Sequence, residues 1–193
     1  MSHYFTNDIN LKHNIDKKKV VINGKEFTFF TDNGVFSKKG LDFGTRTLLE
    51  SLPNDLKGDI LDFGCGYGPI GIYLKTMYDC DVDMLDVNER SVELAKKNAV
   101  LNAVKVNIFV SDIYSNVNKK YDYIVTNPPI RVGKQILYKI LFDAKDYLKE
   151  KGKIYLVINK DQGAKSLMKD LANSYKVSLV NKNKGFFIIC AEK

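Results

Sequence analysis

The feature that most constrains the fold is a regular alternation of short apolar strands with amphipathic helices after residue 58. Strands are predicted at 59–63, 82–86, 104–110, 121–126 and 153–158, and helices at about 45–52, 70–74, 88–101, 136–148 and 164–171. Strands that alternate with helices are joined by right-handed crossovers and form a mostly parallel sheet with helices on both faces. The sequence therefore predicts a doubly wound α/β fold.

The two ends of the chain depart from this alternation. Asn23-Gly24 separates two runs of β-forming residues near the N-terminus, which predicts a tight hairpin. Near the C-terminus, only residues 181–185 separate a strand at 176–180 from one at 186–190. Because this connection is too short for a crossover, the last strand is expected to insert antiparallel into the sheet.

Length and composition favour one cytoplasmic domain. The 193 residues are 45% hydrophobic, which is enough for a sizeable core. We expect one domain over 1–193, with a β-hairpin appendage at 1–40 and a catalytic core at 41–193. Three cysteines at unrelated spacings exclude a disulfide framework and suggest no metal site. The longest apolar run is too short to span a membrane. We expect a monomer without a metal.

A glycine-rich loop follows the first predicted core strand and leads into a helix. Gly64, Gly66 and Gly68 permit a tight turn and close approach of a ligand to the backbone. An acid about 20 positions later, Asp86, suits the ribose of either a nicotinamide dinucleotide or S-adenosylmethionine. The carboxylate of Asp62 opposes a pyrophosphate but suits a ligand with an amino group and a sulfonium, which favours S-adenosylmethionine.

The order Leu-Asp-Phe-Gly-Cys-Gly-Tyr-Gly, then Asp86, then Ser111-Asp112-Ile113, resembles class I S-adenosylmethionine-dependent methyltransferases over residues 58–193. The resemblance implies a Rossmann-like, seven-stranded sheet with an antiparallel last strand. It also implies that Asp62 and Gly64 lie near the methionine end of the cofactor, that Asp86 binds the ribose, and that Asp112 and Ile113 border the adenine.

The segment Asn127-Pro128-Pro129-Ile130 follows the fourth core strand, at the sheet edge where open α/β folds bind ligands. Two prolines hold a rigid extended turn whose carbonyls remain free acceptors. The Asn127 oxygen and the Pro128 carbonyl can accept both N–H bonds of a planar amine and orient its nitrogen toward a methyl donor. The segment resembles the catalytic motif of amino-methyltransferases that act on adenine N6, guanine N2 or glutamine amides.

Residues 33–45 together with 127–131 resemble the guanine-N2 methyltransferases of small-subunit ribosomal RNA, in a single-domain form. That family implies that Phe36 and the 40–45 segment cover the cofactor, although Asp42 is equally expected as a simple helix cap. The complete set of expected cofactor-binding residues is Phe36, Asp42, Gly44, Thr45, Asp62, Gly64, Gly66, Gly68, Asp86, Val87, Asn88, Asp112, Ile113 and Asn127.

The expected acceptor is a guanine N2 in 16S ribosomal RNA, either as free RNA or in the small ribosomal subunit. Two alternatives stay open: methylation of adenine N6 or a protein glutamine, and a noncatalytic RNA-binding module that retains a cofactor pocket. Ile130 counts against the first, because the adenine and glutamine enzymes commonly carry Tyr or Phe there. Asn127 counts against the second.

The net charge of +7 is unevenly distributed along the chain. Residues 41–112 carry 7 cations and 12 anions, whereas residues 113–193 carry 16 cations and 7 anions. An acidic middle segment suits a cationic cofactor, and basic flanks suit RNA phosphates. The sequence thus predicts RNA contacts at the N-terminal appendage and after the fourth strand, at Arg131 and Lys134.

Overall fold

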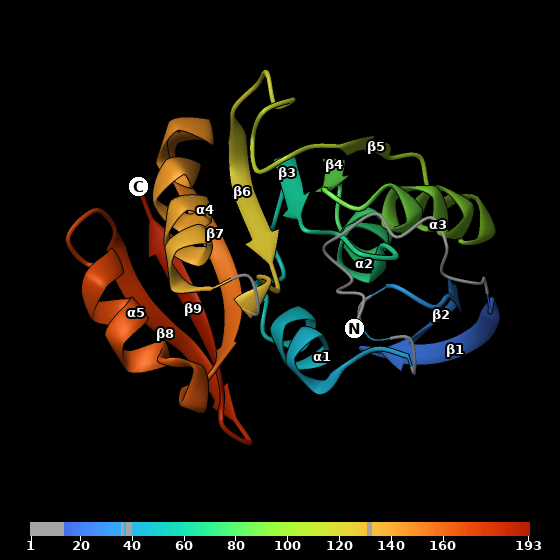
Figure 1. The fold of residues 1–193 in the computed structure, drawn as a ribbon, viewed down its shortest axis with the longest axis horizontal. Helices are drawn as coiled ribbons and strands as arrows, with labels where there is room; N and C mark the ends of the chain where they lie inside the picture. The colour runs from blue at the N-terminus through green and yellow to red at the C-terminus, as the bar shows by residue number, and fades with distance from the viewer. Residues whose placement is uncertain (1–13, 36, 38–39, 131–132) are drawn as a thin grey trace.

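The computed structural model describes residues 14–35, 37, 40–130 and 133–193 (Figure 1). An antiparallel hairpin of β1 (Asp16–Ile22) and β2 (Lys25–Thr31) comes first. Asn23 and Gly24 join the strands with φ values of 45° and 77°, and two consecutive positive φ angles are typical of a type I′ turn. The hairpin predicted from Asn-Gly is confirmed.

The remaining elements alternate as the sequence predicts. They are α1 (Phe43–Glu50), β3 (Gly58–Phe63), α2 (Pro69–Met77), β4 (Cys80–Asp86), α3 (Glu89–Leu101), β5 (Asn107–Val110), β6 (Tyr121–Thr126), α4 (Lys134–Tyr147), β7 (Leu148–Asn159), the 3-10 helix η2 (Lys160–Gln162), α5 (Ala164–Leu171), β8 (Lys176–Asn183) and β9 (Phe186–Glu192). Among these ranges, no helix is long and apolar enough to cross a membrane.

Some boundaries differ from the predicted ones. Helix α1 begins two residues earlier, because the Asp42 carboxylate accepts a hydrogen bond from the Thr45 backbone N–H and caps the helix there. Strand β7 begins at Leu148 rather than at 153, since Leu148 is fully buried and pairs with Tyr121 across a bulge. Helix α4 therefore passes into β7 without a loop.

The seven-stranded sheet has the order β5-β4-β3-β6-β7-β9-β8. Strands β3 to β7 are mutually parallel, and β9 inserts antiparallel between β7 and β8. The β8–β9 connection is a two-residue turn in which Lys184 and Gly185 have φ values of 44° and 85°. The predicted mostly parallel sheet with an antiparallel last strand is confirmed.

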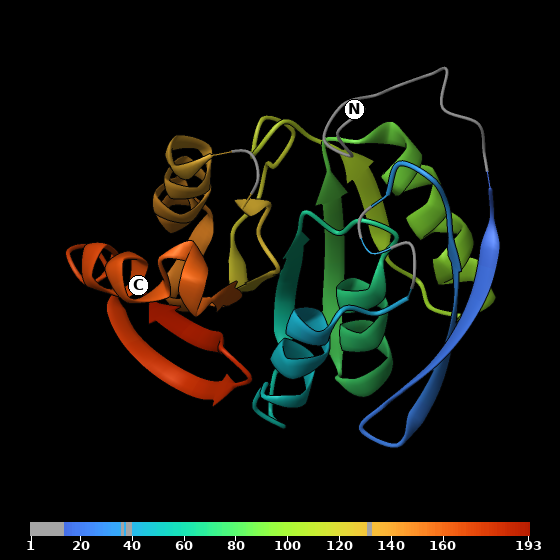
Figure 2. The ribbon, with the colours of Figure 1, turned by 60° about the horizontal axis from the view of Figure 1, so that its bottom comes forward.

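Helices cover both faces of this sheet (Figure 2). One apolar cluster joins α1, α2 and α3 to one face, and a second joins α4 and α5 to the other. The neighbouring residues Ile60 and Leu61 belong to different clusters, as expected for a strand whose side chains alternate between buried faces.

Two asparagines attach the N-terminal hairpin to α3. The Asn98 side chain accepts from the Phe30 backbone N–H at 2.7 Å and donates to the Phe30 carbonyl at 2.9 Å. Asn102, directly after the helix, makes the same pair of bonds to Thr28 at 3.2 and 2.7 Å. These side-chain amides satisfy backbone groups of β2 that a further strand would otherwise bind.

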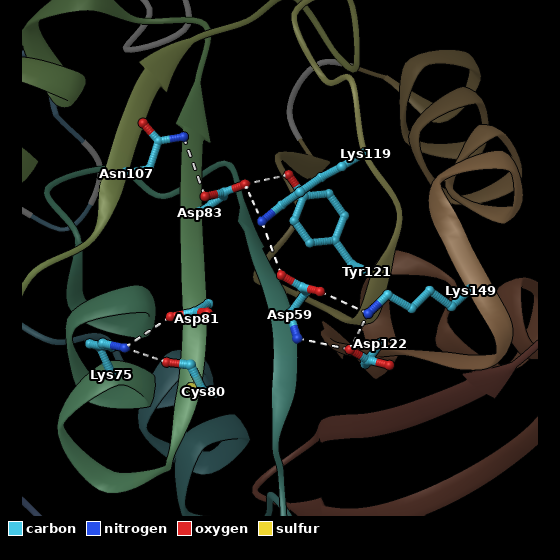
Figure 3. A network of polar contacts seen from close by, with 10 residues as sticks. All are labelled: Asp59, Lys75, Cys80, Asp81, Asp83, Asn107, Lys119, Tyr121, Asp122 and Lys149. Atoms are coloured by element: carbon cyan, nitrogen blue, oxygen red, sulfur yellow. Dashed lines mark hydrogen bonds and ion pairs between the residues drawn. The ribbon is translucent and has the colours of Figure 1, made fainter.

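An ion-pair network ties the parallel strands together toward their amino ends (Figure 3). The Lys149 ammonium lies 2.7 Å from Asp59 Oδ2 and 2.8 Å from Asp122 Oδ2, and the Lys119 ammonium lies 3.1 Å from carboxylate oxygens of both Asp59 and Asp83. The hydrogen bond from Lys149 is the main cause that lowers the pKa of Asp59 below its ordinary value. Lys119 adds to this effect, and burial opposes it. These lysines are therefore engaged in joining strands.

Candidate active site

A cavity of about 280 Å³ lies at the carboxyl edge of the sheet, where β3, β4 and β6 end. This is the side on which open parallel sheets bind ligands. The loops after these strands and the start of α1 bring many of the predicted site residues to its lining: Asp42, Thr45, Gly64, Gly66, Asp86, Val87, Asp112, Ile113, Asn127, Pro128 and Pro129. Residues far apart in the chain, from Asp42 to Pro129, thus meet at one cavity.

The charge of the lining is one-sided. Asp42, Asp86 and Asp112 contribute carboxylates, and no Lys, Arg or His lies among the lining residues that the structure describes. A pyrophosphate would meet three carboxylates without a compensating cation, whereas a cationic ligand is favoured. This arrangement disfavours a nicotinamide dinucleotide and fits a sulfonium with an amino group.

The glycine loop leaves room for a ligand at two positions. Gly64 and Gly66 have φ values of 72° and 55°, and a Cβ added at either would meet no other protein atom within 4 Å. Gly68 behaves differently. It does not line the cavity, and its φ of 99° turns the chain into α2, where an added Cβ would lie 3.1 Å from Ile72 and Met84 side chains.

Asp86 joins the glycine loop to the end of β4. Its Oδ2 accepts from the Gly66 N–H at 2.8 Å, and its Oδ1 accepts from the Asn88 N–H at 2.9 Å. Burial raises the pKa of Asp86, and these N–H groups act in the opposite direction. Since a carboxylate oxygen accepts more than one hydrogen bond, Asp86 retains capacity for a ligand's hydroxyl groups. Asn88 itself is not among the residues that line the cavity, and its side chain caps α3.

Asp62 lies beneath the loop rather than in the cavity lining. It is fully buried, and its Oδ2 accepts from the Gly71 N–H at 2.8 Å, whereas its Oδ1 has no hydrogen-bond partner. Burial is the main cause that raises its pKa to about 8, and the neighbouring Asp86 adds to the effect. An unpaired buried carboxylate oxygen is costly, so positive charge nearby would stabilise this group.

Asn127 is held by the entrance of α1. Its Nδ2 donates to Thr45 Oγ1 at 2.9 Å and to Asp42 Oδ1 at 3.3 Å. The Thr45 hydroxyl donates its own hydrogen to Asp42 Oδ2 at 2.6 Å, so toward Asn127 it only accepts. Both neighbours therefore require the NH₂ group of Asn127, which fixes the orientation of the amide and leaves its oxygen as a free acceptor.

The segment after β5 adds a polar residue that the sequence analysis did not assign to the site. Ser111 lines the cavity, and its hydroxyl donates to the Ile113 carbonyl at 3.0 Å. Ile113 has a φ of 49°, unusual for a β-branched residue. Ser111 directly precedes Asp112 and Ile113 in the sequence, and this position could have predicted that it lines the cavity.

Helix α4 also contributes unpredicted lining residues, Ile136 and Ile140. Their spacing of four places both on one face of the helix that was predicted at 136–148 without a role in the site. Tyr67, Ser37 and Ser91 are further lining residues. Tyr67 lies in the glycine-rich motif and Ser37 in the 33–45 segment, but neither was predicted to bind the cofactor.

Other predicted site residues lie outside the lining. Gly44 packs on the Phe186 ring, which a Cβ would approach to 3.0 Å. Ile130 packs against the α4–α5 cluster, and the Lys134 ammonium is exposed, 4.7 Å from the Tyr138 ring centroid. Phe36 and Arg131 fall outside the described residues. Within the described ranges, no group of three or more His, Cys, Asp and Glu is arranged to hold a metal.

A mostly parallel sheet with an inserted antiparallel strand, together with an acidic cavity at its carboxyl edge, defines a class I S-adenosylmethionine-dependent methyltransferase. More particularly, the chain belongs to the methyltransferase small domain family, which matches residues 26–190. The expected enzyme class and cofactor are confirmed.

Two curated proteins are similar to this chain over most of its length. The uncharacterized protein YbxB of Bacillus subtilis is 43% identical over 197 residues, covering 99% of this chain and 98% of that protein. The ribosomal RNA small subunit methyltransferase C of Colwellia psychrerythraea is 32% identical over 188 residues, but covers 95% of this chain and 52% of that protein.

A solved structure agrees with this relationship. The T. thermophilus 16S rRNA N2 G1207 methyltransferase, in complex with AdoMet and guanosine, superimposes with a TM-score of 0.83 at 28% identity, covering 93% of this chain and 50% of that chain. The chain thus spans about half the length of the ribosomal RNA methyltransferases that it matches.

Proposed function

We propose that this protein methylates the exocyclic N2 amine of a guanine in small-subunit ribosomal RNA, in the cytoplasm. The observation that carries the proposal is the fixed orientation of the Asn127 amide at the cavity. The similarity to methyltransferases of small-subunit ribosomal RNA supports the choice of acceptor.

The cavity fits the cofactor. Asp86 would bind the ribose hydroxyls, Gly64 and Gly66 would allow the methionine part to approach the backbone, and Asp112 with Ile113 would border the adenine. Asp62 would stabilise positive charge from beneath the loop. When bound, S-adenosylmethionine supplies an electrophilic methyl group on a positively charged sulfur.

Acceptor binding would depend on the turn after β6. The free oxygen of Asn127 and the Pro128 carbonyl would accept the two N–H bonds of the guanine amine and direct the nitrogen lone pair toward the methyl donor. Pro128 and Pro129 keep this turn rigid. The proton of the methylated amine becomes acidic and leaves to water, so no strong general base is required.

The outer side of the site would contact the RNA backbone. Lys134 begins the helix that follows the catalytic turn, and its ammonium is exposed. Arg131, in the same connection, is proposed from the sequence alone. Both would bind phosphates rather than read the base.

The direct test is incubation with tritiated S-adenosylmethionine and either free 16S ribosomal RNA or small subunits, followed by nucleoside analysis. Label in N2-methylguanosine is expected. Label in N6-methyladenosine or in protein glutamine would overturn the choice of acceptor.

An isosteric variant tests the catalytic turn. Asn127→Asp keeps the shape of the side chain but places a second carboxylate where Nδ2 lies 3.3 Å from Asp42. Methyl transfer should fall by about 100-fold or more, with cofactor affinity changed much less. Unchanged transfer would remove Asn127 from the mechanism.

A further inference from the structure

The tip of the β8–β9 hairpin carries positive charge beside the active site. Lys182 and Lys184 lie at this tip. Lys160 begins η2, directly after β7, and its backbone N–H donates to the Gly185 carbonyl at 2.7 Å. We call Lys160, Lys182 and Lys184 the tip lysines. All three are exposed, and within the described part of the chain none forms an ion pair.

The fold brings this tip to the entrance of α1. Because β9 runs antiparallel to β7, with Asn159 opposite Phe186, the hairpin turn lies at the carboxyl edge of the sheet. The Phe186 ring packs against Phe43 with ring centroids 5.7 Å apart. Figures 1 and 2 both show the β8–β9 turn beside α1.

Phe43 connects the tip to the catalytic turn. It follows Asp42, the residue whose carboxylate lies 3.3 Å from Asn127 Nδ2. The Lys184 ammonium lies 5.2 Å from the centroid of the Phe43 ring. Only a short series of contacts therefore separates this positive charge from the amide that is proposed to bind the acceptor amine.

Aromatic rings position two of these lysines without neutralising them. Lys184 lies over Phe43, and the Lys182 ammonium lies 5.2 Å from the centroid of Phe187. A cation–π contact orients the side chain but leaves its full positive charge for a further partner. The lysines toward the opposite edge differ, since carboxylates neutralise Lys119 and Lys149 (Figure 3).

We propose that the tip lysines bind backbone phosphates of the RNA strand whose base enters the active site. The inference rests on the proposed function, since it takes RNA as the substrate. Exposed ammonium groups without acidic partners match a polyanion, and single-stranded RNA presents phosphates on both sides of a base that leaves the stack. This adds a contact surface on the last hairpin to the one proposed at Lys134.

The test compares two triple variants of equal charge change. In one, Lys160, Lys182 and Lys184 are replaced by Gln. In the control, Lys97, Lys105 and Lys120 are replaced by Gln. These lysines are also exposed and without ion pairs in the described chain, but Lys97 lies on α3, and Lys105 and Lys120 lie in the connections just before β5 and β6. Binding of a 16S ribosomal RNA fragment is measured from about 50 to 200 mM salt, together with turnover.

The tip variant should bind the RNA roughly tenfold more weakly and lose about 2 from the slope of log K against log salt. Its kcat at saturating RNA and its affinity for S-adenosylmethionine should stay within about twofold of the wild type, since these lysines contact neither cofactor nor amine. The control should change RNA binding by less than about threefold. Equal weakening by both variants, or none by the tip variant, would overturn the proposal.

Binding and turnover are scored separately, so the two proposals fail in different ways. If the wild type forms N2-methylguanosine but the tip variant binds RNA like the control, only the role of the tip lysines is wrong. If no N2-methylguanosine forms, the function is wrong, and specific loss of RNA binding by the tip variant would still support the surface.

Discussion

The Asn127 side-chain nitrogen lies 2.9 Å from the Thr45 hydroxyl oxygen, across 82 residues of sequence. Since the Thr45 hydroxyl already donates to Asp42, it accepts from Asn127 and determines which end of the amide faces the cavity. The start of α1 thereby positions the proposed catalytic residue. The orientation of Asn127 in the 127–130 motif therefore depends on Asp42 and Thr45, which precede the glycine loop in the sequence.

Thr45→Val should lower kcat by about tenfold, because the amide of Asn127 loses the shorter of its two hydrogen bonds and samples the flipped orientation. Thr45→Ser keeps the hydroxyl and should restore most of the activity. The measurement is kcat and KM for RNA alongside cofactor affinity. If valine weakens cofactor binding while kcat stays unchanged, Thr45 acts on the cofactor instead.

Asp86→Asn should weaken S-adenosylmethionine binding by about 10- to 100-fold, the range for loss of a charged hydrogen-bond partner. Titration calorimetry on the variant measures the effect. Asp81→Asn, at the exposed start of the same strand, is the matched control and should change affinity by less than about twofold. Equal losses in both variants would indicate a general charge effect rather than a ribose contact.

Gly66→Ala tests whether the space above the loop belongs to the cofactor. Its φ of 55° makes any side chain unfavourable, by roughly 1–2 kcal/mol, so Gly163→Ala serves as the control. Gly163 also has a positive φ, 86°, and open space around an added Cβ, but lies away from the cavity. Both variants should lose similar stability, and only Gly66→Ala should lose cofactor affinity; a shared loss would contradict the assignment.

Asp62 should give the cofactor-free protein a specific pH dependence. Its pKa rises from 3.8 to about 8 on folding, so the folded state retains a proton that the unfolded chain has lost between these values. The free energy of unfolding contributed by this group therefore falls as pH rises from about 4 to 8. Urea unfolding at pH 5 and pH 8 should show Asp62→Asn gaining stability relative to the wild type at the higher pH. A constant difference would show that Asp62 titrates normally.

The structure divides the acidic residues of the middle segment between two roles. The acidic middle segment does supply the cavity carboxylates Asp42, Asp86 and Asp112. Asp59 and Asp83 of the same segment instead form ion pairs with Lys119 and Lys149 of the basic C-terminal segment. The predicted RNA contact at the N-terminal appendage stays a prediction.

The sequence by itself determined the architecture and the edge at which the site forms. Alternating strands and helices required parallel crossovers, and the short connection after residue 180 required an antiparallel last strand. Because parallel strands end at one edge, the glycine loop, Asp86, Asp112 and Asn127 had to converge there. Such conclusions depend only on periodicity and chain connectivity, which are local properties.

Only the tertiary structure decided which side chains meet. The Asn98 bonds to β2, the Thr45 contact that orients Asn127, and the packing of the β8–β9 tip on Phe43 all join segments far apart in the chain. A hydrogen bond depends on distances of a few tenths of an ångström and on the direction of each group. Those quantities follow from how the helices pack on the sheet, which no spacing of residues along the chain specifies.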